Sequence, residues 1–109
     1  MERIYNKLVR DKIPQIIEEK GEEPITRELD LDEYKLALEN KLEEECREVI
    51  TARGEDRIEE IADALEVLKA LAKLEGATLD DIIDVANRKS TKRGAFDKRI
   101  FLEKVISSK

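Results

Sequence analysis

The chain has no histidine, no tryptophan and a single cysteine, and these absences exclude several kinds of chemistry. Without imidazole groups, a zinc centre or a covalent mechanism through histidine is disfavoured. The lone cysteine, Cys46, cannot form a disulfide within one chain, which suits a reducing cytosol and predicts a cytoplasmic protein. It falls on an apolar helical stripe, so we expect a buried structural thiol rather than a reactive one.

Aromatic residues are also rare, at 4% of the chain, and there is no long apolar run. The charged N-terminus does not resemble a signal peptide, and no stretch is long enough for a membrane span. A core of leucine, isoleucine, valine and alanine favours helices, and 109 residues suit one domain covering positions 1–109.

Charge is abundant but unevenly distributed. The net charge is −6, yet residues 18–84 contain 23 acidic and 9 basic residues, whereas the two ends together contain 4 acidic and 12 basic ones. An acidic middle repels a nucleic-acid backbone, so we expect no nucleic-acid partner. Basic ends beside an acidic centre instead suit a small polyanion that carries metal ions.

Periodicity and capping signals predict an all-α fold with four helices. We expect them at about 11–20, 30–53, 56–75 and 78–93, with glycines closing each one. Helix starts are predicted where an N-cap residue precedes an acidic partner by three positions. These pairs are Asp30 with Glu33, Asp56 with Glu59, and Thr78 with Asp81. The tail at 96–105 is expected to form a short strand or an extended arm.

The chain is organised around two acidic pairs on either side of Gly54. Glu48 and Glu60 each lie six residues from this glycine, and Glu45 and Asp63 each lie nine away. If both flanks are helical and Gly54 turns the chain, the two pairs face each other across an antiparallel hairpin. Because residues three apart share a helix face, four carboxylates converge on one spot.

These carboxylates lie within or beside apolar stripes, where an unpaired charge is costly. No arginine or lysine matches them within the motif, so the pattern favours a divalent cation. Hard oxygen ligands without histidine indicate Mg²⁺, with Mn²⁺ as an alternative. The predicted ligands are Glu45, Glu48, Glu60 and Asp63. Other glutamates of these helices are expected to be solvated.

Basic residues near both ends are candidates for holding phosphate oxygens. The last turns of the fourth helix contribute Asn87, Lys89 and Arg93, and the N-terminal segment contributes Lys7 and Arg10. Two ordinary explanations compete with this one: cations are common in a last helical turn, and N-terminal bases are commonly solvated surface residues.

The third helix is apolar on two sides, with only a narrow polar strip. One side carries Ala64, Val67, Leu71 and Leu74, and the other carries Ile58, Ile61, Leu65 and Leu68. Four helices cannot cover both sides, so we expect a homo-oligomer, either a dimer or a tetramer.

With these motifs, the chain resembles the all-α nucleoside triphosphate pyrophosphohydrolases, the MazG-like group that includes phosphoribosyl-ATP pyrophosphohydrolase. The hallmark E-E-x-x-E followed by E-x-x-D corresponds to residues 44–48 and 60–63. The opening YNKLVRDKIP and the closing KRGAF extend the resemblance over most of the chain. The resemblance implies a MazG-like bundle, the same four Mg²⁺ ligands, and phosphate contacts from Asn87, Lys89 and Arg93. It also implies that Glu44 lies near the site.

The implied reaction is Mg²⁺-dependent hydrolysis between the α- and β-phosphates of a nucleoside triphosphate, of the house-cleaning type, with Glu44 or Glu45 accepting the proton of water. Two alternatives remain open. One is the phosphoribosyl-ATP pyrophosphohydrolase of histidine biosynthesis, and the other is a non-catalytic helical interaction module.

Overall fold

The structure is a computed structural model that describes residues 1–107. In this range the chain is all-helical, with four α-helices and no strands. They are α1 (Ile13–Glu19), α2 (Leu31–Thr51), α3 (Gly54–Leu74) and α4 (Leu79–Arg93). None of the described helices is long and apolar enough to cross a membrane.

Two of the three predicted capping pairs form. The Asp30 side chain accepts a hydrogen bond from the Glu33 amide at 2.9 Å, and the Glu33 side chain accepts one from the Asp30 amide at 3.4 Å. Thr78 and Asp81 form the same reciprocal pair at the start of α4. These contacts satisfy amides that have no partner inside the helix, so they define where α2 and α4 begin.

The prediction that the third pair, Asp56 with Glu59, marks the start of a helix is wrong. The α3 helix begins two residues earlier, at Gly54, where Arg53 is the N-cap and makes no capping hydrogen bond through its side chain. Correspondingly, α2 ends at Thr51 rather than near residue 53. Gly54 has φ of +58°, a left-handed conformation that favours glycine, and it lets the chain reverse within a two-residue connection.

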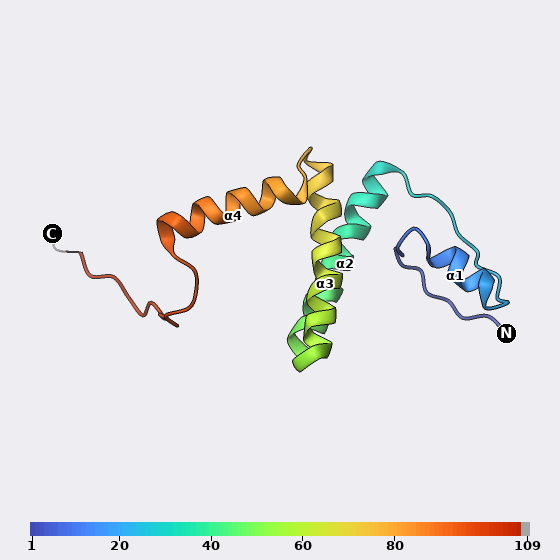
Figure 1. Cartoon of the computed structure of the whole chain (residues 1–109). Helices are drawn as coiled ribbons and strands as arrows, with labels where there is room; N and C mark the ends of the chain where they lie inside the picture. The colour runs from blue at the N-terminus through green and yellow to red at the C-terminus, as the bar shows by residue number, and fades with distance from the viewer. Residues whose placement is uncertain (108–109) are drawn as a thin grey trace.

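The α2 and α3 helices lie side by side and antiparallel, and they form the centre of the molecule (Figure 1). Their buried apolar residues are Leu38, Val67 and Ala72, and the predicted inner stripe of Ala64, Leu71 and Leu74 is half-buried. This hairpin is the part of the fold that positions the acidic residues.

Of the other two helices of the described chain, only α4 contacts this hairpin, and α1 contacts no other helix. The α4 helix touches only the C-terminal end of α3 and then extends away, while α1 belongs to an N-terminal excursion beside α2 (Figure 1). The described chain measures 68 × 33 × 25 Å with a radius of gyration of 19.1 Å. A compact domain of this length has a radius of gyration near 13 Å. A single chain therefore does not close into a compact four-helix bundle.

Several apolar side chains are exposed at the surface of the single chain. Ile82 and Ile83 on α4 are both 45% exposed, because no helix covers that face in a single chain. Cys46 is exposed, so the prediction of a buried thiol is wrong. It lies about 100° around the helix from the buried Glu45, so the two side chains occupy different faces of α2. The tail after α4 contains a turn, in which the Arg99 amide donates to the Phe96 carbonyl oxygen at 3.2 Å, and no strand up to residue 107.

Candidate metal centre

The α2–α3 hairpin brings the predicted acidic residues together. Glu45 from α2 and Glu60 and Asp63 from α3 each offer a carboxylate oxygen, and these oxygens lie within 4.8 Å of one another. The predicted fourth ligand, Glu48, is more exposed than the others, but its carboxyl lies within hydrogen-bonding reach of both Glu45 and Glu60. We refer to Glu45, Glu48, Glu60 and Asp63 as the carboxylate cluster.

Burial makes this cluster different from a solvated acidic face. Glu45 is only 6% exposed, and it is the one buried charged residue of the described chain. Its Oε2 atom and the Oε2 atom of Glu60 are fully buried and have no hydrogen-bond partner among the described residues. A buried acceptor without a donor costs about 1–3 kcal/mol, and more when it is charged. The cluster therefore contains acceptor atoms that lack a cation or a proton.

The crowding of carboxylates changes their proton affinity. The pKa of Glu60 is raised to about 7, first by its hydrogen bond with the Glu48 carboxyl and then by burial and the neighbouring negative charges. Burial is the main cause that raises the pKa of Glu45, and Glu48 adds to it, whereas Lys41 acts in the opposite direction. In the absence of a metal ion, the cluster thus retains protons near neutral pH.

Two cations lie beside the cluster, so the expectation that no arginine or lysine matches it is wrong. The Nζ atom of Lys41 lies 3.6 Å from Glu45 Oε1 and 3.7 Å from Glu44 Oε2. Arg10 donates a hydrogen bond from Nη2 to Asp63 Oδ1 at 2.6 Å. The position of Lys41, four residues before Glu45, was a signal available in the sequence. Nothing local predicts the Arg10 contact, because 53 residues separate Arg10 from Asp63.

The donor set fits a hard divalent cation. Its ligands are carboxylate oxygens from two facing helices, without nitrogen or sulfur, and Mg²⁺ and Mn²⁺ prefer such ligands. The two orphaned Oε2 atoms are acceptors that such an ion would satisfy. The residues present therefore fit the predicted metal.

The predicted phosphate-binding residues are distributed unevenly around this centre. Arg10 reaches the cluster, whereas the Nζ atom of Lys7 lies 5.8 Å from the centre of the Tyr5 ring. Asn87, Lys89 and Arg93 are exposed on α4, which leads away from the hairpin (Figure 1). Their role in holding phosphate stays a prediction, because a single chain does not bring them to the carboxylates.

An open groove of about 520 Å³ adjoins the cluster on the side of the hairpin turn. It is lined by Glu48, Thr51, Ala52, Glu55, Asp56, Glu59 and Glu60. Its lining contains five carboxylates and no basic residue, so a bare polyphosphate would be repelled from it. Anionic ligands can approach this side only together with cations.

Arg57 has a structural role at the hairpin turn that no sequence pattern indicated. Its guanidinium donates hydrogen bonds to the carbonyl oxygens of Val49 at 3.1 Å, Ala52 at 3.0 Å and Ile50 at 3.3 Å. These carbonyls belong to the last turn of α2 and the connection, where no intrahelical donor remains. Arg57 thus joins the start of α3 to the end of α2 at the turn of the hairpin that carries the two acidic pairs.

Comparison with known proteins gives little further information. No family model and no solved structure matches the chain. A protein of Mycolicibacterium smegmatis described as uncharacterized is 47% identical over 49 residues, which are 45% of this chain and 50% of that protein. The chain spans about half the length of this curated relative. The function of this chain therefore has to follow from the chemistry of its own site.

Proposed function

We propose that this protein is a Mg²⁺-dependent nucleoside triphosphate pyrophosphohydrolase of the MazG-like type, which releases a nucleoside monophosphate and pyrophosphate. The observation that carries the proposal is Glu45, a 94% buried carboxylate with an orphaned oxygen in a group of carboxylates from two helices. Solvated helix charges do not explain such burial. The spacing of the E-E-x-x-E and E-x-x-D motifs, set around the hairpin turn, supports the same class.

In this proposal Glu45, Glu48, Glu60 and Asp63 hold Mg²⁺, and Mn²⁺ is expected to substitute. When bound, the ion would lower the pKa of a water molecule and neutralise charge on the phosphate oxygens. The hairpin itself supplies the preorganisation, because it fixes carboxylates from α2 and α3 within 4.8 Å before any ligand arrives.

Glu44 or Glu45 would accept the proton of the attacking water. Burial raises the pKa of Glu45, which makes its carboxylate a better base near neutral pH. Glu44 is half-buried, and its Oε2 atom lies 3.7 Å from the Nζ atom of Lys41, which also lies 3.6 Å from Glu45; from this position Glu44 would orient a water molecule. Arg10 and Lys7 would contact phosphate oxygens from the N-terminal segment.

We further propose that the active form is a homo-oligomer, a dimer or a tetramer. The outer side of α3 exposes Ile58, Ile61, Leu65 and Leu68, with exposed fractions of 40–67%. If a second copy covers this face, the α4 helix of one copy could approach the carboxylate cluster of the other. This would bring Asn87, Lys89 and Arg93 to a cluster, which they do not reach within a single chain. Such an assembly suits the cytoplasm, where the exposed Cys46 stays reduced.

The test is pyrophosphate release from canonical and modified nucleoside triphosphates and from phosphoribosyl-ATP, with and without Mg²⁺. Glu48→Gln is expected to reduce release by at least about 100-fold, as is typical when a catalytic electrostatic contact is removed. Glu43→Gln is the matched control, since Glu43 is an exposed glutamate on the same helix outside the cluster. It should retain full activity.

The substrate panel also separates the alternatives. Release mainly from phosphoribosyl-ATP would assign the enzyme to histidine biosynthesis, while release from nucleoside triphosphates supports the proposal. No release from any compound, together with no Mg²⁺ binding by the folded protein, would overturn it and leave the helical interaction module.

A further inference from the structure

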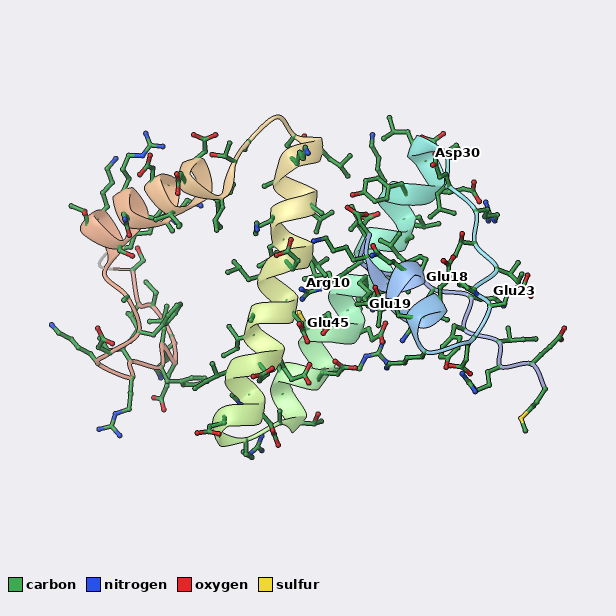
Figure 2. All side chains as sticks on the ribbon, turned by 45° about the vertical axis from the view of Figure 1, so that its right-hand side comes forward. Arg10, Glu18, Glu19, Glu23, Asp30 and Glu45 are labelled. Carbon is green, nitrogen blue, oxygen red and sulfur yellow. The ribbon has the colours of Figure 1, made fainter. Side chains whose placement is uncertain are left out.

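The N-terminal segment reaches the carboxylate cluster through a single side chain. Arg10 lies in irregular chain before α1, yet its Nη2 atom is 2.6 Å from Asp63 Oδ1 on α3. Figure 2 shows the Arg10 side chain extending from this segment to the α2–α3 pair, on the side where Glu45 is found. The contact spans 53 residues of sequence and ties the start of the chain to the centre of the molecule.

We propose that Arg10 is a built-in counter-ion that competes with the divalent cation for Asp63, and that the arriving cation releases its guanidinium to bind the polyphosphate. The inference rests on the proposed function, since it uses the same metal site. It adds a coupling that the acidic motif alone does not imply: metal binding and the docking of the N-terminal segment oppose each other.

Competition follows from the position of the guanidinium. Asp63 contributes one of the three carboxylates that converge within 4.8 Å, and Arg10 already bonds to it. A divalent ion at this spot would face a fixed positive charge at close range, and the two cations would repel each other. By linkage, each then lowers the affinity of the cluster for the other by the same factor.

The Arg10–Asp63 pair is suited to displacement because it is accessible to solvent. The Arg10 side chain is 58% exposed and the Asp63 side chain is 46% exposed. Ion pairs with this much exposure are weak, so a doubly charged ion with several carboxylate ligands should prevail. The other cation beside the cluster, Lys41, is only 20% exposed and is held on α2 itself, so it is expected to stay.

A guanidinium that is released from Asp63 can bind phosphate oxygens. Arginine presents a planar fork of donors that matches two oxygens of one phosphate group. Once freed, Arg10 stands at the edge of the cluster, where a metal-bound polyphosphate would lie. The same side chain would thereby neutralise the metal-free cluster and, after the metal binds, contact the substrate.

The test measures Mn²⁺ binding by isothermal titration calorimetry, without nucleotide, for the wild type, Arg10→Gln and Arg3→Gln. Arg3 is a matched control, because it is also 58% exposed and donates a 2.6 Å hydrogen bond, but to Glu22, outside the cluster. We expect Arg10→Gln to bind Mn²⁺ roughly two- to fivefold more tightly, the range of a weak surface ion pair. Arg3→Gln should bind like the wild type.

Two further measurements use the same proteins. Addition of Mn²⁺ to the wild type should increase amide hydrogen exchange in residues 7–12, since the segment loses its anchor. In the presence of saturating Mn²⁺, Arg10→Gln should bind inorganic triphosphate roughly tenfold more weakly than wild type, because a charge-assisted hydrogen bond is lost.

The outcomes separate this inference from the proposed function. If the wild type binds Mn²⁺ and Arg10→Gln binds it equally well or more weakly, the competition is refuted while the metal site stands. If neither protein binds Mn²⁺, both the metal site and the competition are refuted. Tighter Mn²⁺ binding combined with weaker triphosphate binding in Arg10→Gln supports the inference.

Discussion

The Nε atom of Arg57 donates a hydrogen bond to the backbone carbonyl oxygen of Val49 at 3.1 Å, from the start of one central helix to the end of the other. The contact therefore joins the two helices that carry the acidic pairs, at the end of the hairpin where the chain turns.

Arg57→Ala should destabilise the hairpin. It removes a partly buried guanidinium that bonds three carbonyl oxygens, and we expect a loss of about 1–3 kcal/mol in the free energy of unfolding. Urea denaturation monitored by circular dichroism measures it. Arg53→Ala is the comparison, since Arg53 also bonds carbonyls of this turn but only locally and in solvent, and it should lose less than about 0.5 kcal/mol. Equal losses would show that Arg57 has no special role.

Divalent metal should stabilise the protein through Glu45. At a free Mn²⁺ concentration of about 100 times Kd, ligand linkage adds about 2.7 kcal/mol to the stability. Glu45→Gln should lose most of this gain, because the buried ligand oxygen is replaced by a neutral amide. Thermal unfolding with and without Mn²⁺ measures the effect, and Glu43→Gln, exposed on the same helix, should keep it. A gain that survives in Glu45→Gln would place the metal elsewhere.

The stability of the metal-free protein should fall as the pH rises from about 5 to 8. Folded Glu60 retains its proton up to its pKa of about 7, whereas the unfolded chain releases this proton near 4.5. The folded state therefore binds more protons in this window, and the stabilisation, complete below about 4.5, is lost as the pH passes 7. Urea denaturation in chelator at several pH values tests the slope. Glu60→Gln should flatten it and Glu59→Gln should not; an unchanged slope in Glu60→Gln argues against this assignment.

Loss of the N-cap of α2 and loss of the N-cap of α4 should destabilise different parts of the fold. Asp30→Ala is expected to lower the stability of the hairpin by about 1 kcal/mol, because α2 is half of it. Thr78→Ala should weaken α4 by a similar amount but leave the hairpin unfolding unchanged, since α4 packs only on the end of α3. Residue-resolved hydrogen exchange distinguishes local from global opening. Loss of hairpin stability in Thr78→Ala would mean that α4 is coupled to the core.

The exposed apolar side of α3 should be the contact between copies. Leu65→Asp places a charge on this face and is expected to shift the protein toward monomer in size-exclusion chromatography with light scattering. Lys73→Glu introduces a negative charge at an exposed position of the polar strip of the same helix, which also carries Glu59 and Glu66, and should leave the assembly intact. A wild type that is monomeric at all concentrations would contradict the proposed oligomer.

Much of the helical architecture followed from local rules. The caps at Asp30 and Thr78 and the stop at Gly94 depend on residues within a few positions, so the sequence determines them. The turn between α2 and α3 was predicted less accurately. There Asp56 and Glu59 offered a capping pattern, but Arg57 bonds the end of α2 and the helix starts at Gly54 instead.

What the sequence alone determined is the set of helices and the symmetric spacing of four carboxylates about Gly54, because helix periodicity turns spacing directly into a shared face. Only the tertiary structure decided which of these groups are buried, which cations meet them, and where Cys46 points. The Arg10–Asp63 contact depends on how an irregular segment crosses the hairpin, and local propensity contains no information about that path.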